Sequence, residues 1–255
     1  MTNADRESAA QFLLAARQRR TPGPRIPAQF RPGDIDDGLA IQARVTELLG
    51  QRVGGYKCSL PSTPRPVLLA PIFEPTITHA SPCPVRAVGA AARIEPEIAF
   101  VMARDLPMRA TAYTDSEVRD AIGEVRLVLE ILGSRYSDLD TATFPEMVAD
   151  GLANQGLFVG PALQDPWERE LEALPIVIDS PAGVLAMHEG KHPDGHPVRP
   201  LYWLANYLAT GGTPLCAGMV VTTGSYCGAV DVPLDTPITV GYGDLGTLSA
   251  TLTRA

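Results

Sequence analysis

Apolar and polar positions follow a helical period at the front of the chain. Residues 5–20 place apolar side chains at i, i+3, i+4 and i+7 spacing, which gathers them on one face of a helix. Residues 34–49 form a second apolar stripe through Ile41, Val45, Leu48 and Leu49. Gly50 is a suitable stop for the second helix, and the proline-rich and glycine-rich residues 21–33 predict a connector between the two. We therefore expect a helical layer over residues 1–52, with no candidate chemistry in it.

Short apolar runs replace the helical period after residue 52 and predict strands. The runs cover residues 54–59, 93–100, 127–132, 157–160, 174–178, 219–223, 238–242 and 247–252. Residues 61–86 hold seven prolines, so they are predicted to be loop and sheet edge, and the length of this segment is typical of a lid or binding loop.

Two helices are expected among these strands. The first opens with a capping box at Thr114 and continues an apolar stripe through Val118, Ile122 and Val125. The second covers residues 201–208. Strands that do not alternate regularly with helices argue against Rossmann and TIM-barrel architectures. We predict an α+β fold, a mixed β roll with peripheral helices over residues 53–255 and an N-terminal helical part over residues 1–52.

Composition and charge exclude several classes of protein. The chain has 255 residues, of which 45% are hydrophobic and 20% charged, as in a globular protein. Its net charge of −8 argues against a nucleic-acid partner and against docking on anionic membranes. No apolar run approaches the roughly 20 residues of a membrane span. The N-terminus lacks the order of a signal peptide, and the four cysteines contain no CxxC pair, so we predict a cytoplasmic protein with free thiols.

Three glutamates stand in the two most apolar strand candidates. Glu95 and Glu97 alternate with Ile94 and Ile98, so both carboxylates point to the same face of a strand, and Glu130 interrupts an apolar run. Carboxylates placed together repel, and a buried one is costly unless a positive group compensates it. Oxygen ligands of this kind suit a hard divalent cation. The alternative is a solvated sheet face, with Glu130 capping or pairing with an arginine.

Lysine is rare in this chain. The 21 basic residues include only Lys57 and Lys191. An arginine stays charged at any working pH, whereas a buried lysine can change its pKa and transfer a proton. Lys57 lies in an apolar, glycine-bearing strand candidate, whereas Lys191 lies among His, Gly and Pro in a segment expected to be an exposed loop, so Lys57 is the candidate for chemistry. The alternative is that its retention reflects chance.

Three further patterns carry little weight. Residues 241–246 fit GxGxxG, but no helix follows them as a dinucleotide site requires. His188, His192 and His196 have zinc-site spacing for a helix, but glycine and proline between them break any helix and predict loop histidines. Ser225 lacks the GxSxG context of a nucleophile, so its hydroxyl is better suited to binding a substrate carboxylate.

Together these stretches resemble the fumarylacetoacetate hydrolase superfamily, and most of all its 2-keto-4-pentenoate hydratase and 4-oxalocrotonate decarboxylase branch. The matching segments, in family order, are GYK (55–57), APIF (70–73), RIEPEIAF (93–100), LEILGSR (129–135), VAD (148–150), WLAN (203–206) and VVTTGS (220–225). The resemblance runs from about residue 53 to the C-terminus. No single motif identifies the family, but the motifs together do so.

The resemblance implies a mixed β roll, a homo-oligomer and a metal-dependent lyase that acts on a small 2-oxo acid in aromatic-compound catabolism. It implies Mg²⁺ or Mn²⁺ bound by Glu95, Glu97 and Glu130, and Lys57 as the catalytic proton carrier. The substrate-binding residues that it implies are Leu60, Arg135, Thr223, Gly224 and Ser225. The expected reaction is hydration of a 2-hydroxy-2,4-dienoate.

Decarboxylation of a 4-oxalocrotonate-type substrate, hydrolysis of an acylpyruvate and a non-catalytic relative stay open as alternatives. The hydrolase alternative would need a Glu–His pair on the early loop, where this chain has Glu74 and His79. Two departures from the family pattern concern the substrate. Glu74 replaces a glycine of the proline-rich segment, and residues 151–154 replace the asparagine, small residues and serine that often follow Asp150.

Overall fold

The computed structural model describes residues 1–19, 21–63, 67–87 and 89–255 of the chain. The helices are α1 (Asn3–Gln18), α2 (Ile35–Leu49), α3 (Asp115–Asp120), α4 (Phe144–Ala149) and α5 (Val198–Thr210). The strands are β1 (Val53–Ser59), β2 (Leu68–Phe73), β3 (Ile77–Thr78), β4 (Cys83–Val85), β5 (Ala91–Met102), β6 (Ile122–Leu132), β7 (Asn154–Ala162), β8 (Ala173–Ser180), β9 (Gly183–Lys191), β10 (Val220–Thr222), β11 (Val230–Pro233), β12 (Pro237–Tyr242) and β13 (Thr247–Arg254). Among the described residues no helix is both long and apolar enough to span a membrane.

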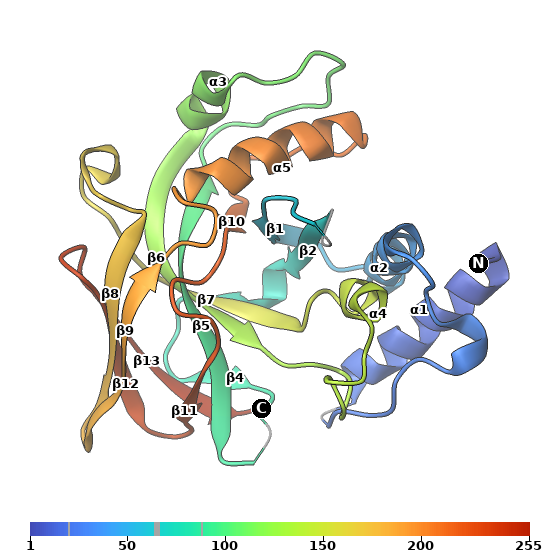
Figure 1. Ribbon diagram of the computed structural model, residues 1–255, viewed down its shortest axis with the longest axis horizontal. Helices are drawn as coiled ribbons and strands as arrows, with labels where there is room; N and C mark the ends of the chain where they lie inside the picture. The colour runs from blue at the N-terminus through green and yellow to red at the C-terminus, as the bar shows by residue number, and fades with distance from the viewer. Residues whose placement is uncertain (20, 64–66, 88) are drawn as a thin grey trace.

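Two mixed sheets form the body of the molecule. The larger, eight-stranded sheet has the order β2-β1-β10-β5-β6-β7-β3, with β11 also paired to β5, and the five-stranded sheet has the order β4-β13-β12-β8-β9. Parallel pairs such as β1 with β10 occur beside antiparallel pairs such as β5 with β6. Figure 1 shows the strands curling around one another, with α5 lying across them. The predicted α+β roll with peripheral helices is confirmed.

The main hydrophobic core lies on one face of the larger sheet. Ile94, Ile98 and Phe100 of β5 pack with residues of β8, β12, β13 and α5 on one face. Because side chains alternate along a strand, Glu95 and Glu97 point to the other face. The packing of the core therefore fixes the direction in which the carboxylates project.

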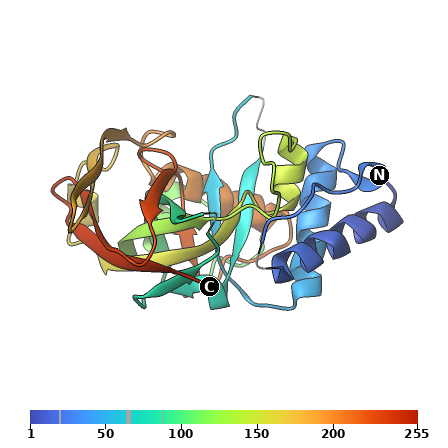
Figure 2. The same cartoon turned by 90° about the horizontal axis from the view of Figure 1, so that it is seen from below.

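The N-terminal helices form a layer against α4. Thr2 caps α1 with a capping box, Asp34 caps α2, and Gly50 ends α2 in a left-handed conformation at φ 62°. The apolar faces of α1 and α2 meet Tyr136 and Ala149 from the segment around α4. Figure 2 shows these helices together at one end of the molecule. The division at residue 52 stays a prediction, and this layer draws on residues from both sides of it.

Three sequence predictions need correction in detail. The helix that begins after Thr114 ends at Asp120, so Ile122 and Val125 belong to β6 and not to a helical stripe. Residues 61–86 contain β2, β3 and β4, although β2 lies at the end of its sheet, where a strand tolerates Pro71. Residues 64–66, which belong to the predicted lid, lie outside the described residues. Strand β9 was not predicted, because its exposed positions carry apolar residues such as Val184 and Met187, so apolar and polar residues do not alternate along it.

Candidate active site

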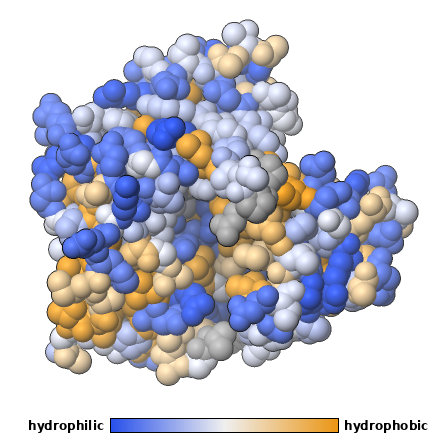
Figure 3. Space-filling view, viewed as in Figure 1, coloured by the Kyte–Doolittle hydropathy of each residue, from blue (hydrophilic) through white to orange (hydrophobic). Residues whose placement is uncertain are grey.

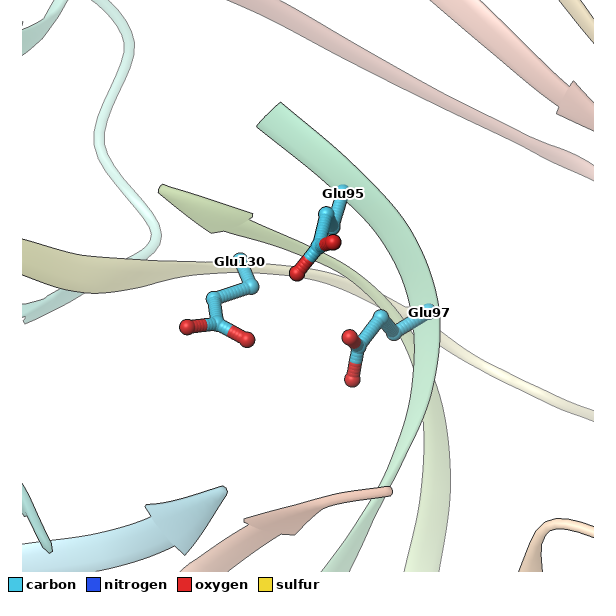
Figure 4. A group of neighbouring side chains, drawn as sticks. All are labelled: Glu95, Glu97 and Glu130. Atoms are coloured by element: carbon cyan, nitrogen blue, oxygen red, sulfur yellow. The ribbon is translucent and has the colours of Figure 1, made fainter. Parts of the chain in front are cut away.

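Three glutamates converge on the face of the larger sheet that points away from the main core. Glu95 and Glu97 project from β5, and Glu130 lies on β6 directly opposite Glu95 in the antiparallel register. One carboxylate oxygen of each residue lies within 4.8 Å of the others. Figure 4 shows the three side chains pointing into one space. The cluster predicted from the sequence is present, and it could hold a metal ion.

Burial decides between the two interpretations of these carboxylates. Glu130 is fully buried and Glu97 is 2% exposed, so neither lies on a solvated face. Burial, with the neighbouring charges of Glu130 and Glu95, raises the pKa of Glu97 to about 8. Burial also raises the pKa of Glu95, against the effect of Lys57. The site thus concentrates negative charge where water does not compensate it.

Hydrogen bonds orient two of the carboxylates and leave one oxygen unpaired. The hydroxyl of Thr222 and the backbone N–H of Gly224 (3.0 Å) donate to Oε2 of Glu97. Oε1 of Glu130 accepts from Lys57 Nζ at 2.6 Å and from Asn154 Nδ2 at 2.9 Å. Oε2 of Glu130 is buried and has no partner among the described residues. An unpaired buried oxygen beside two further carboxylates fits a hard divalent cation that takes oxygen ligands.

Lys57 is the ion-pair partner of Glu130. It lies on β1, its side chain is 12% exposed, and its register partner on β10 is Thr222. Burial acts to lower the pKa of Lys57, but the carboxylates of Glu130, Glu95 and Glu97 outweigh burial and raise this pKa above its ordinary value. The sequence alone did not predict this direction, which arises because three carboxylates surround one ammonium group.

A strained turn places two groups beside this ion pair. Gly151, Leu152 and Ala153 all have positive φ, at 77°, 54° and 59°. Such a conformation is costly for residues that carry a Cβ and is concentrated at functional sites. The turn brings the carbonyl of Leu152 to 3.5 Å from Lys57 Nζ and starts β7 with Asn154 next to Glu130. Residues 151–154, which depart from the family pattern, thus supply the side-chain amide of Asn154 that contacts Glu130, a candidate metal ligand.

The five residues that the resemblance implies in substrate binding have different surroundings. Thr223 is buried and its hydroxyl has no partner among the described residues, whereas the Ser225 hydroxyl donates to the carbonyls of Pro96 and Gly228. The N–H of Gly224 is engaged by Glu97. These assignments stay predictions.

The other two residues of this set make contacts within the protein. The N–H of Leu60 donates to Asp194 Oδ2 at 2.9 Å. Arg135 is 2% exposed and bonds Asp150 through its Nε at 2.5 Å. Their roles in substrate binding stay predictions as well.

One large cavity contains the site. It measures about 1680 Å³ and is lined by residues of the roll and of the N-terminal helical layer. Lys57, the three glutamates, Gly224, Ser225 and Arg135 all contribute to its wall. Figure 3 shows the surface hollowed between these two parts of the molecule. The cavity exceeds the usual size of a small-ligand pocket, so the functional groups occupy only a part of it.

The weaker sequence patterns do not form sites in the described residues. Residues 241–246 cover the end of β12 and the turn that leads to β13, without a helix. His188 lies in β9, and His192 is buried against Tyr226. The three-glutamate group is the cluster of potential metal ligands found in the described part of the chain. Thr222 and Asn154 were missed as functional residues, because their contacts with the glutamates join segments distant in sequence.

No model of a known protein family matches the chain. The 2-keto-4-pentenoate hydratase of Paraburkholderia xenovorans (strain LB400) is 30% identical to it over 237 residues, covering 88% of this chain and 86% of the hydratase. The chain belongs to the 2-keto-4-pentenoate hydratase and 4-oxalocrotonate decarboxylase branch of the fumarylacetoacetate hydrolase superfamily.

Other members of the branch are also similar to this chain. The 4-oxalocrotonate decarboxylase of Pseudomonas putida is 30% identical over 158 residues, covering 62% of this chain and 59% of the decarboxylase. The structure of 4-oxalocrotonate decarboxylase from Pseudomonas putida G7, complexed with magnesium and adipate, superposes with a TM-score of 0.79 at 22% identity, covering 99% and 98% of the two chains. At that identity the superposition establishes the shared fold.

Proposed function

We propose that this protein is a metal-dependent lyase that hydrates a 2-hydroxy-2,4-dienoate to a 4-hydroxy-2-oxo acid. The observation that carries the proposal is the meeting of three carboxylates and one buried lysine on the wall of one cavity. The hydratase named among its relatives, which aligns over most of both chains, supports this reaction. A small 2-oxo acid is accordingly the proposed substrate class, and a homo-oligomer stays a prediction.

Glu95, Glu97 and Glu130 would hold Mg²⁺ or Mn²⁺. The donor set consists of oxygens only, and the magnesium in the related decarboxylase structure supports this choice of ion. When bound, such an ion supplies Lewis-acid polarisation of the oxygens at the 2-oxo acid end of the substrate. Thr222 and Gly224 would hold Glu97 in its ligand orientation by the two hydrogen bonds that they donate.

Lys57 would carry the proton. Its Nζ projects from β1 into the cavity and is positioned by Glu130 at 2.6 Å and the Leu152 carbonyl at 3.5 Å. Ketonisation of a dienol moves a proton from oxygen to carbon, and addition of water to the remaining double bond then gives the hydroxylated product. A group able to donate and accept a proton at a fixed position accelerates such steps, typically by about 10²- to 10⁴-fold. The segment from Thr223 to Ser225 would hydrogen-bond the substrate carboxylate.

Decarboxylation is the second candidate reaction. The similarity to 4-oxalocrotonate decarboxylase in sequence and fold supports it. Both reactions would use the same carboxylates and the same lysine. Product analysis distinguishes them directly, because only decarboxylation releases carbon dioxide.

The Glu–His pair that an acylpyruvate hydrolase would need does not lie at the proposed metal site. Glu74 pairs with Arg52 at 3.5 Å, and His79 Nδ1 contacts the Val159 carbonyl at 3.0 Å. Both residues line a second, smaller cavity, whose described wall contains none of the three clustered glutamates. They are therefore not placed to activate a water molecule beside the proposed metal site.

The decisive experiment measures thermal stability with and without Mg²⁺ and oxalate, which mimics the chelating end of a 2-oxo acid. A ligand that binds only the native state raises apparent stability by mass action. We expect a rise that requires the metal in wild type and is lost in Glu97→Gln, and a matching loss of dienoate turnover. Glu124→Gln is the matched control, because Glu124 is an exposed residue of β6 paired with Arg126. No shift in the wild type would contradict the proposed metal site.

A further inference from the structure

Three arginines, Arg17, Arg86 and Arg135, form a hydrogen-bonded group around Asp150, near the proposed metal site. Arg135 Nε donates to Asp150 Oδ1 at 2.5 Å. Arg17 Nη2 donates to the main-chain carbonyl of Asp150 at 2.7 Å, and Arg86 donates to the carbonyl of Arg17. Among the described residues, Asp150 is the one carboxylate bonded within this group, and only Arg135 bonds it; Arg17 and Arg86 bond main-chain carbonyls. Three guanidinium groups and one carboxylate leave an excess of two positive charges.

Part of this excess charge is held away from water. Nε of Arg17 is buried and has no hydrogen-bond partner among the described residues. Burial, and then the nearby Arg135, lower the pKa of Arg17 to about 9, and the same two causes lower the pKa of Arg86. Buried charges without enough counter-charge destabilise a fold. A bound anion would remove this cost.

Two of the three arginines, Arg86 and Arg135, share one cavity with the glutamates. Both arginines thus line the cavity that Lys57 and Glu130 also line. A single residue of β7, Asn154, connects the two groups: its Nδ2 donates to Glu130 Oε1 at 2.9 Å, and its carbonyl accepts from Arg135 Nη1 at 2.7 Å. A short molecule held at the glutamates by one end would reach the arginines with the other.

We propose that Arg86, together with Arg17 and Arg135, binds a second carboxylate, so that the substrate is a dicarboxylic 2-oxo acid and not a monocarboxylic one. This inference rests on the proposed function, because it assumes that the 2-oxo acid end lies at the three glutamates. Of the N–H groups on Arg86, only one on Nη2 is engaged by a described residue, so the fork of this arginine remains able to bind a carboxylate.

The test compares two acids of equal chain length, 2-oxoadipate and 2-oxohexanoate, which differ in the second carboxylate. Their Kd values are measured by calorimetry on the full-length protein with Mg²⁺. Hydrogen bonds between charged groups predict that the wild type binds 2-oxoadipate about 10- to 100-fold more tightly. Arg86→Gln should lose this preference while its Kd for 2-oxohexanoate stays unchanged. Arg86→Lys, which keeps the charge, should retain part of the preference.

Arg19→Gln is the matched control. Arg19 lines the same cavity but lies over the Phe12 ring, and it makes no contact with Asp150. It should keep the full preference, although it removes one positive charge as Arg86→Gln does. Equal affinity of the wild type for the two acids would overturn the second-carboxylate site while leaving the proposed function intact. Binding of neither acid would overturn the 2-oxo acid site itself, and the second-carboxylate site with it.

Discussion

Glu95 and Glu130 face each other directly across the antiparallel ladder of β5 and β6. Like charges in opposite positions destabilise a sheet, and no arginine from the described residues pairs with either side chain. Lys57 forms its ion pair with Glu130, at 2.6 Å. The two carboxylates therefore repel each other in the metal-free protein, and a bound cation would relieve this repulsion. The site can accordingly be tested by removing one of the two charges in the absence of metal.

Glu95→Gln should stabilise the metal-free protein. Removing one of two opposed charges is expected to raise the free energy of unfolding by about 0.5 kcal/mol. The same change should weaken the stabilisation that Mg²⁺ provides, because it removes a candidate ligand. Urea unfolding in EDTA and then in Mg²⁺ measures both effects. If Glu95→Gln is destabilising in EDTA and keeps the full response to Mg²⁺, Glu95 is not part of a metal site.

Lys57→Met separates proton transfer from metal binding. We expect kcat for a dienoate to fall by at least about 100-fold, because no other amino group lines the described wall of the cavity. The response of thermal stability to Mg²⁺ and oxalate should persist, since the three glutamates remain. Stopped-flow loss of dienoate absorbance and thermal unfolding measure the two properties on the same preparation.

Lys191→Met is the matched control for this change. Lys191 is the other lysine of the chain and lies exposed at the end of β9. Its replacement should leave kcat unchanged. Near-normal turnover by Lys57→Met would remove Lys57 from the mechanism, whatever its effect on stability.

Local sequence patterns predicted the elements that carry the site. Alternation along a strand placed Glu95 and Glu97 on one face, and the scarcity of lysine identified Lys57. Both features depend only on neighbouring residues or on composition. The capping box at Thr114 and the glycine at Gly50 likewise predicted helix termini, because caps are formed within a few residues of the chain.

Contacts between distant segments could not be predicted in this way. The bond from Thr222 to Glu97 joins residues 125 positions apart, and the packing of Arg17 on Asp150 joins residues 133 apart. Neither leaves a periodic pattern in either segment. Strand β9 was missed for a related reason: its exposed face carries Val184 and Met187, so apolar residues do not mark its buried side.

His192 should make stability depend on pH in the acid range. Burial, and then the neighbouring His196, lower the pKa of His192 to about 4 in the folded protein, against an ordinary value of 6.5. Between these values the unfolded chain binds more protons, so stability falls as pH decreases from 6.5 towards 4 and is constant above 6.5 on this account. The integrated loss is about 1–3 kcal/mol.

His192→Asn tests this assignment. The replacement retains an acceptor for the N–H of Asp194, which donates to His192 Nδ1 at 3.2 Å, but it does not titrate. The unfolding free energy of each protein is measured with urea at pH 7 and at pH 5. The decrease between the two pH values should be smaller in the variant than in the wild type, and the difference is the contribution of His192. Other acid-sensitive groups are common to both proteins and cancel in the difference. An identical pH dependence would show that His192 is not the responsible group.

Ala153→Gly should stabilise the fold and reveal whether strain at this turn serves the site. Ala153 has φ 59°, a left-handed conformation that costs a residue with a Cβ about 1–2 kcal/mol and costs glycine little. A gain of about 1 kcal/mol in unfolding free energy is therefore expected, whereas Ala149→Gly in α4 should lose stability. The turn also positions Asn154 against Glu130 and Leu152 against Lys57. If rigidity of the turn holds these groups in place, Ala153→Gly will lower kcat several-fold despite its greater stability, and urea unfolding with steady-state kinetics on one preparation measures both.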